Sequence, residues 1–463
     1  MEEELFNNEL INRFEQMLEN KENLFFETED YHEIITYYLD VGDLPYAKKA
    51  LQYALEMYPS NIEFQIKKLE YFLAMEDMYV VADLIKELKD VGQHDIDYTI
   101  CVARFWSLKQ QPKQAIQFYK KALEFGEDQD YLYNCIGNEY LNLNEISKAL
   151  YSFKKALEVE LDDDFAFYSC VQCFEELHLY RECVDFLNQY IDLRPYSEMA
   201  WTQLGVQYVA LKDYDNAYRA FDYATLINPK SIMALAQKAG VLEKLEDFEA
   251  AIQVYEETLA LDDSAAYTYM KIGQCYMQLG KPFKALKSFH QSIHEDPQLD
   301  QAWVATSDLY DQIGNYEEAL YYLNRGIDLD AFNVEYWKRK AYLHIQMVKI
   351  EEAAQDYNRL VELEPNNYYN WLGLSEVLIT LGDYAKAIEN VKKALKHFEK
   401  AELYYQLSNC YFLLGNESKG KLNLEKAAQM NASLQEDMFK KYPILENKMD
   451  GFLPKSSIKK KNE

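Results

Sequence analysis

The sequence predicts an all-α fold, a solenoid built from a row of antiparallel helix pairs. Small residues recur with a period close to 34 residues along almost the whole chain. The apolar residues around each of them are spaced three, four or seven apart, as on one face of a helix. Turn-forming residues are scarce, with 15 glycines and 10 prolines among 463 residues. A fixed period between about 20 and 50 residues is typical of a solenoid or array.

The recurring small residue marks the second helix of each pair. It is found at Ala47, Ala82, Ala115, Ala149, Cys183, Ala217, Ala251, Ala285, Ala319, Ala353, Ala387 and Gly420. A small side chain at this place lets the neighbouring helix approach closely. The recurrence predicts about twelve helix pairs over residues 28–432.

The first helix of each pair carries two aromatic or large apolar residues, sixteen and nine positions before the small residue, as at Trp201 and Tyr208. All five tryptophans occupy one of these two phases, which predicts that they belong to the core. The first helix should end in a left-handed glycine, at Gly42, Gly280, Gly314, Gly382 and Gly415. Prolines suited to the first turn of the second helix follow, at Pro45, Pro112 and Pro282. Prolines that stop the second helix close several periods, at Pro59, Pro195, Pro229, Pro297 and Pro365.

The two ends of the chain differ from the repeats. Residues 1–27 are expected to form an N-terminal capping helix, with apolar residues on one side at Leu10, Phe14, Met17 and Leu18. Residues 433–445 are expected to form a C-terminal capping helix. Residues 446–463 are rich in lysine, so we expect a basic flexible tail.

Charge and cysteine content limit the classes of function. A formal charge of −30 repels nucleic acid and anionic membranes. It favours a basic protein partner, although acidic surfaces that only keep the chain soluble explain it more simply. No secretory signal and no apolar stretch of membrane-spanning length is evident. Seven scattered cysteines indicate reduced thiols and a cytoplasmic protein.

No motif predicts catalysis, a cofactor or a metal site. Cys170 and Cys173 form a C-x-x-C pair, but they occupy core positions of the repeat, where cysteine acts as a small hydrophobe. His290 and His294 are four residues apart without a neighbouring metalloprotease glutamate, so two surface histidines are the better interpretation. Phosphate-binding glycine loops are also missing. We therefore expect a chain that is not an enzyme.

One repeat carries every element of a known pattern. Its residues are Trp201, Leu204, Gly205, Tyr208, Ala217, Phe221, Ala224 and Pro229. This pattern resembles the tetratricopeptide repeat. The resemblance implies an α-solenoid that winds into a right-handed superhelix, with the first helices lining a concave groove that binds proteins.

Inner-face residues of the first helices that the core does not use are the predicted partner-binding residues. Aromatic residues and methionine at such positions suit protein contacts. The set is Tyr131, Asn134, Asn138, Phe165, Tyr168, Gln172, Tyr267, Met270, Gln274, Tyr369, Tyr405 and Asn409. The alternative for each residue is packing against the next repeat.

The predicted function is a protein-protein interaction scaffold or adaptor that holds a partner peptide or helix in the groove. The alternative is a non-catalytic interaction or regulatory subunit of an enzyme complex. The partners are one or more proteins, with no nucleic acid and no membrane insertion, and self-association is a further hypothesis.

Overall fold

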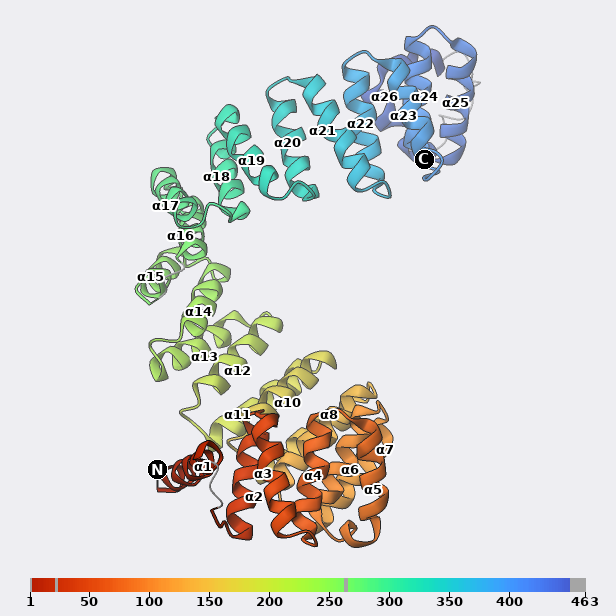
Figure 1. The fold of residues 1–463 in the computed structure, drawn as a ribbon. Coiled ribbons are helices and arrows are strands. Elements are labelled where there is room, and N and C mark those ends of the chain that lie inside the picture. Colours follow the sequence, from red (N-terminus) through yellow and green to blue (C-terminus); the bar gives the residue numbers. More distant parts are fainter. Residues whose placement is uncertain (1, 21–23, 262–264, 450–463) are drawn as a thin grey trace, which may run out of the picture. The chain divides into compact units, whose positions relative to one another are not determined.

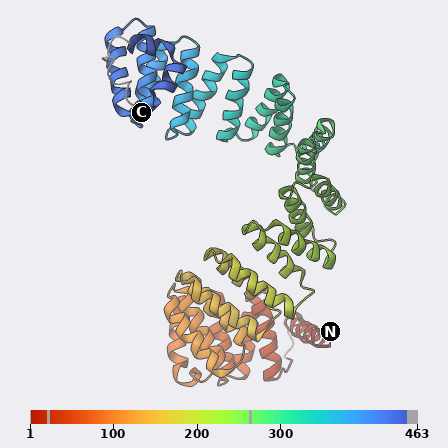
Figure 2. The ribbon, with the colours of Figure 1, turned by 180° about the vertical axis from the view of Figure 1, so that it is seen from behind.

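The computed structural model describes residues 2–20, 24–261 and 265–449, and these residues form helices joined by short turns, without a β-strand. The chain divides into two compact units, Met1–Asp213 and Tyr214–Glu463, called here the N-terminal and C-terminal units. Consecutive helices lie side by side within each unit (Figure 1), and the reverse view shows the same order (Figure 2).

The N-terminal unit holds twelve α-helices among its described residues. They are α1 (Glu2–Asn20), α2 (Thr28–Asp40), α3 (Leu44–Met57), α4 (Ile62–Ala74), α5 (Met78–Gly92), α6 (Ile96–Leu108), α7 (Pro112–Ala122), α8 (Gln129–Asn142), α9 (Ile146–Val159), α10 (Asp164–Glu176), α11 (Tyr180–Leu193) and α12 (Glu198–Ala210). A short 3-10 turn, η1 (Leu123–Phe125), extends α7.

The C-terminal unit continues the alternation of first and second helices. Its helices are α13 (Tyr214–Ile227), α14 (Ile232–Lys244), α15 (Phe248–Leu259), α16 (Ala266–Gln278), α17 (Pro282–Glu295), α18 (Asp300–Gln312), α19 (Tyr316–Leu329), α20 (Val334–Gln346), α21 (Ile350–Leu363), α22 (Tyr368–Thr380), α23 (Tyr384–Ala394), α24 (Ala401–Leu413), α25 (Glu417–Met430), α26 (Gln435–Lys441) and α27 (Pro443–Met449). The 3-10 turn η2 (Ala432–Leu434) precedes α26. The predicted all-α fold of consecutive antiparallel helix pairs is confirmed.

The turn inside each pair depends on one residue in the left-handed conformation. The predicted glycines adopt it, with φ between 64° and 78° at Gly42, Gly280, Gly314, Gly382 and Gly415. Repeats without glycine place another residue in the same conformation at the same phase, including Glu76, Gln110, Asn144, His178, Lys212, Glu246 and Val348. The turn geometry is therefore kept even where the residue type does not favour it.

Proline marks the starts and stops as expected. Pro45, Pro112 and Pro282 lie in the first turns of α3, α7 and α17. The second helices α3, α11 and α17 end just before the prolines that were predicted to stop them. These positions are where a missing backbone N–H costs least.

Small residues permit the close approach of the two helices of a pair. A Cβ placed on Gly273 in α16 would lie 2.4 Å from a ring carbon of Phe289 in α17. The same relationship holds between Gly137 in α8 and Phe153 in α9, at 2.5 Å. Alanines at the recurring small position, such as Ala149 and Ala285, are fully buried. The core consequently runs along the helix pairs as a chain of clusters.

Tryptophan has a different role from the one expected. Only Trp371 is buried, whereas the other four tryptophans are half-buried, so the prediction that all five are core residues was too strong. Four indole N–H groups donate to a backbone carbonyl six residues earlier. These bonds join Trp201 to Pro195, Trp303 to Pro297, Trp337 to Ala331 and Trp371 to Pro365, at 2.8–3.0 Å. In these four repeats the indole thus fixes the turn that enters its helix.

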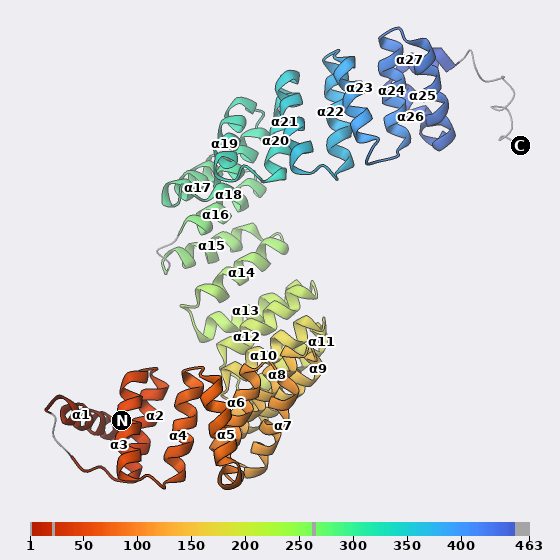
Figure 3. The same cartoon turned by 45° about the vertical axis from the view of Figure 1, so that its right-hand side comes forward.

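The ends of the array are closed by extra helices. Leu10, Phe14 and Met17 of α1 are buried in one cluster with residues of α2 and α3, and α1 ends at Asn20 rather than continuing to residue 27. Two short helices, α26 and α27, take the place of the single helix expected over 433–445 (Figure 3). Pro443 explains the break, because its ring cannot continue the α26 hydrogen-bond ladder. Most of the expected basic tail, residues 450–463, lies outside the described residues.

Candidate binding surface

Three aromatic side chains of two successive first helices are exposed in the N-terminal unit. Tyr131 of α8 is 45% exposed, and Phe165 and Tyr168 of α10 are 51% and 44% exposed. The Phe165 ring makes an edge contact with Phe153, with centroids 6.0 Å apart. Burial of the hydroxyl end and the Cys135 thiol raise the pKa of Tyr131 above its ordinary value. These rings are held in place yet offer a large apolar surface.

Polar side chains lie on the same helices. The amide of Asn134 donates to the carboxylate of Asp163, which also caps the start of α10 by accepting from the Ala166 N–H at 3.0 Å. Asn138 and Gln172 are exposed, and the Gln172 amide donates to Glu176 at 2.9 Å. The contact between α8 and the start of α10 fixes the spacing of the aromatic rings.

Part of the predicted set in the C-terminal unit is also exposed. Tyr267 of α16 is 53% exposed and Tyr369 of α22 is 75% exposed. Gln274 of α16 is half-buried.

Met270, Tyr405 and Asn409 are buried, with exposures of 2%, 0% and 3%, so their prediction as solvent-facing residues was wrong. Met270 packs on Ala302 and Ala305 of the next first helix, which is the alternative of packing between repeats.

The C-terminal helices account for the burial of Tyr405. Tyr405 and Phe412 of α24 share a cluster with Tyr442 and Leu445, at the end of α26 and in α27. The Gln406 amide donates to the Tyr442 hydroxyl at 3.4 Å. These two C-terminal helices form a cover over α24. Ion pairs from Lys441 to Glu376 of α22 and from Lys448 to Glu417 hold the cover in place. The chain itself therefore occupies the inner face of its last repeat.

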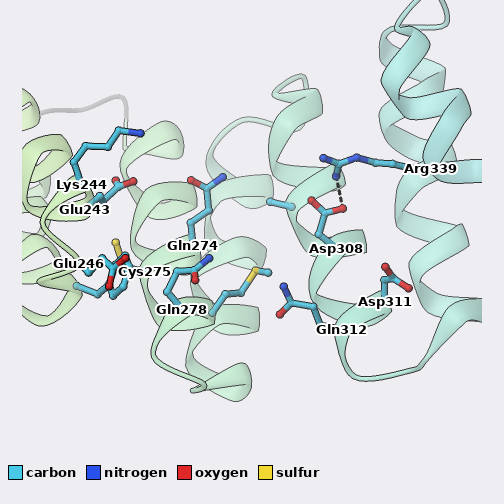
Figure 4. Close-up of a pocket in the computed structure, with 13 residues that line it drawn as sticks. Glu243, Lys244, Glu246, Gln274, Cys275, Gln278, Asp308, Asp311, Gln312 and Arg339 are labelled. Carbon is cyan, nitrogen blue, oxygen red and sulfur yellow. Dashed lines mark hydrogen bonds and ion pairs between the residues drawn. The ribbon is translucent and has the colours of Figure 1, made fainter. Parts of the chain in front are cut away.

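A cavity of about 720 Å³ opens on the inner face of the C-terminal unit (Figure 4). Its lining comes mainly from four consecutive first helices, α14, α16, α18 and α20. The lining residues are Glu243, Lys244, Glu246, Phe248, Gln274, Cys275, Met277, Gln278, Ala305, Asp308, Asp311, Gln312 and Arg339. Of the predicted binding residues, only Gln274 belongs to it.

The cavity is acidic, and the carboxylates of Asp308 and Asp311 in its lining are partly buried. Arg339 of α20 forms an ion pair with Asp308 of α18, and Lys271 lies 3.2 Å from Glu243. Burial raises the pKa of Asp308 although Arg339 opposes the shift, and burial also raises the pKa of Asp311. The carboxylates are thus held where water solvates them poorly.

Sequence reasoning missed these acidic residues although the repeat register contains the signal. Gln274 and Asp308 are 34 residues apart, as are Met277 and Asp311. Residues at one phase of consecutive repeats lie on neighbouring first helices. A comparison of equivalent inner-face positions in successive repeats would have predicted that Asp308 and Asp311 lie next to Gln274.

The cysteines and histidines considered as redox or metal positions lie in environments that suit a structural role. Cys170 and Cys173 are buried free thiols, and burial raises the pKa of Cys173 to about 11, so it remains a protonated thiol at neutral pH. His290 contacts the Tyr322 hydroxyl at 3.0 Å, whereas His294 points into solvent. Across the described residues, no three histidine, cysteine, aspartate or glutamate side chains gather as metal ligands would.

Membrane insertion was not expected, and none of the helices in the described part of the chain combines the length and apolar character needed to cross a bilayer.

Family models of the tetratricopeptide repeat match the C-terminal unit. They cover residues 234–266, 270–334, 338–402 and 401–434, which include the helices around the cavity.

Two curated proteins illustrate the similarity in sequence. Anaphase-promoting complex subunit 3 of Schizosaccharomyces pombe is 23% identical over 256 residues, 54% of this chain and 38% of that protein. DnaJ homolog subfamily C member 7 of Homo sapiens is 32% identical over 85 residues, 18% of this chain and 17% of that protein. The chain thus spans well under half the length of either relative.

Solved structures resemble the chain at low scores. The crystal structure of the APC/C hetero-tetramer Cut9-Hcn1 covers 83% of this chain and 90% of its own, at 14% identity and a TM-score of 0.37. TTC0263 of Thermus thermophilus covers 40% of this chain and 100% of its own, at 23% identity and a TM-score of 0.33. Scores this low say nothing about function.

Proposed function

Because this chain is a tetratricopeptide repeat protein, we propose that it is an interaction scaffold whose exposed first-helix residues hold a segment of a partner protein. The observation that carries the proposal is the exposure of Tyr131, Phe165 and Tyr168 on two successive first helices. Large aromatic rings left uncovered on one face are typical of protein-binding surfaces. Tyrosine also contributes strongly to such interfaces when a partner covers it.

The rigid placement of these rings supports the same proposal. Phe165 rests on Phe153, and the contact of Asn134 with Asp163 joins α8 to the start of α10. A surface that is ordered before binding loses little conformational entropy when the partner arrives. A peptide or a helix laid across α8 and α10 would cover all three rings.

The experiment compares two triple variants of the full-length chain. The test variant carries Tyr131→Ala, Tyr168→Ala and Tyr267→Ala, which remove exposed tyrosines of first helices. The control carries Tyr79→Ala, Tyr151→Ala and Tyr321→Ala, which remove tyrosines of second helices that are at least 52% exposed. Affinity capture from lysate of the source cells, followed by mass spectrometry, measures partner recovery.

We expect the test variant to lose the partner and the control variant to keep it. Circular dichroism should show equal helix content in both. Equal recovery by the two variants, or equal loss from both, would contradict the proposal that the first helices provide the binding face.

A second candidate is a non-catalytic subunit of a larger assembly, and its support is the similarity to anaphase-promoting complex subunit 3. In this case the chain would remain bound to its partners through native purification at constant stoichiometry. Native mass spectrometry distinguishes the two candidates, since an adaptor exchanges partners and a subunit does not. A concentration-dependent mass in sedimentation would instead indicate self-association.

The proposal places the chain in a reducing compartment such as the cytoplasm and assigns it no catalytic role. Its seven cysteines are free, and six of them are buried among apolar side chains. Such thiols are compatible with reducing conditions and offer no exposed disulfide-forming pair.

A further inference from the structure

The cavity of the C-terminal unit has acidic groups that its own cations do not satisfy. Four carboxylates line it, from Glu243, Glu246, Asp308 and Asp311, against the cations of Lys244 and Arg339. Glu243 and Asp308 have ion-pair partners. Within the described part of the chain, Glu246 and Asp311 form no ion pair within 4.0 Å, although the charge of Arg339 acts on Asp311 and opposes the rise of its pKa on burial. An excess of negative charge therefore remains along the lining of the cavity.

Uncommitted amides lie beside these carboxylates. Gln274, Gln278 and Gln312 contribute to the lining from α16 and α18 (Figure 4). None of their side chains takes part in a hydrogen bond with another residue described by the structure. Each amide oxygen can accept two hydrogen bonds. The wall thus offers amide oxygens that water or an incoming donor can satisfy.

One guanidinium already sits in this environment. The Arg339 side chain reaches from α20 to Asp308 of α18, so the inner face accommodates a planar cation between two first helices. Tyr342, one turn after Arg339, is 47% exposed, and the Asp311 carboxylate raises the pKa of its phenol. An aromatic ring close to a carboxylate is a suitable environment for a second guanidinium.

From these contacts we infer that the cavity receives a segment of the partner protein that bears two arginines, with one guanidinium directed at Asp311 and the other at Glu246. This inference rests on the proposed function and specifies the chemistry of the partner. Arginine fits better than lysine because its five N–H donors can reach a carboxylate and neighbouring amide oxygens together. The formal charge of −30 would bring such a segment to the surface faster.

The test uses two fluorescein-labelled synthetic peptides and the full-length chain. One peptide has a central arginine pair in a glycine-serine sequence, and the other has citrulline, a neutral analogue of the same shape, at both places. Fluorescence anisotropy measures their affinity for three proteins: the unmodified chain, a Glu246→Gln/Asp311→Asn variant and a Glu256→Gln/Glu257→Gln variant. Glu256 and Glu257 are exposed residues of the second helix α15, so the control changes the net charge equally outside the cavity.

We expect the arginine peptide to bind the unmodified chain and the citrulline peptide to bind about tenfold more weakly or not at all. The Glu246→Gln/Asp311→Asn variant should lose about tenfold in affinity, whereas the control should stay within about twofold. Equal affinity of the two peptides, equal loss in the two variants, or no binding of the arginine peptide would each overturn the inference.

The proposed function has a separate readout. Partner capture that depends on Tyr131, Tyr168 and Tyr267 would persist if only the arginine site were wrong. Loss of both readouts would reject the scaffold itself.

Discussion

His344 of α20 and Asp356 of α21 face each other in the core of one helix pair, with Nδ1 of the imidazole 2.5 Å from a carboxylate oxygen. Both side chains are buried. Burial raises the pKa of Asp356, while the contact with His344 opposes that shift. This polar pair replaces the apolar contacts found elsewhere, since Leu242 and Val254 occupy the same two phases of an earlier repeat.

Breaking this pair on one side should destabilise the repeat. Asp356→Val leaves the His344 ring buried without its partner, at a cost of about 2 kcal/mol. His344→Leu/Asp356→Val copies Leu242 and Val254 and should recover most of that loss. Hydrogen exchange of α20 and α21 in the full chain measures both changes, and a double variant less protected than the single one would refute the explanation.

Val348 adopts φ 60° in the turn between α20 and α21, where five other repeats have glycine. A β-branched residue is strained in this region because its side chain crowds the backbone. We expect Val348→Gly to stabilise the C-terminal unit by about 1 kcal/mol, and Gly314→Val to destabilise it by a similar amount. Urea unfolding followed by circular dichroism measures the two midpoints, which should move in opposite directions.

Two glycines on neighbouring first helices should respond oppositely to alanine. Gly240 in α14 has no atom within 4 Å of the place that a Cβ would take, so Gly240→Ala should stabilise the helix by about 0.5–1 kcal/mol. Gly273 in α16 faces the Phe289 ring, so Gly273→Ala should cost about 1–3 kcal/mol. Adding Phe289→Leu should relieve the steric clash in Gly273→Ala. Thermal unfolding of the unmodified chain, Gly240→Ala, Gly273→Ala and Gly273→Ala/Phe289→Leu measures these changes, and Gly240→Ala should unfold at the highest temperature.

Stability should increase in mild acid. Burial raises the pKa of Glu70, Asp308 and Asp311 above values of 4.5, 3.8 and 3.8. These groups bind protons more tightly in the folded state, so the fold gains stability as pH falls towards those values and loses it as pH rises. Repulsion within a chain of formal charge −30 acts in the same direction.

The urea midpoint should therefore rise as pH is lowered from about 7 towards about 4.5, the ordinary pKa of a glutamate. High salt screens the general repulsion, so the rise of the midpoint that persists in high salt comes from the buried carboxyls. A midpoint that falls over this range would show that other groups dominate.

The helix pairs follow from the sequence because each repeat carries its own local signals. Gly280 and Pro282 stop one helix and start the next within three residues, whatever the neighbouring repeats do. Val348 shows why glycine alone was an incomplete guide, since the surrounding helices impose the left-handed turn on an unfavourable residue.

The sequence predicted the binding surface only in part, because this surface depends on contacts between repeats. Tyr131 and Tyr168 were recognisable from their place on one helix. Tyr405 has an equivalent place, but Tyr442 and Leu445 cover it from a segment that has no counterpart in the other repeats. Asp308 and Asp311 look like ordinary surface acids until the helices on either side enclose them.

The cover over α24 also limits the length of a bound ligand. The uncovered first helices of the C-terminal unit run from α14 to α22, and neighbouring first helices are about 10 Å apart. Four such intervals make about 40 Å, which an extended peptide crosses with about twelve residues at about 3.3 Å each. A longer recognition sequence on this face would have to continue past α14 or displace α27.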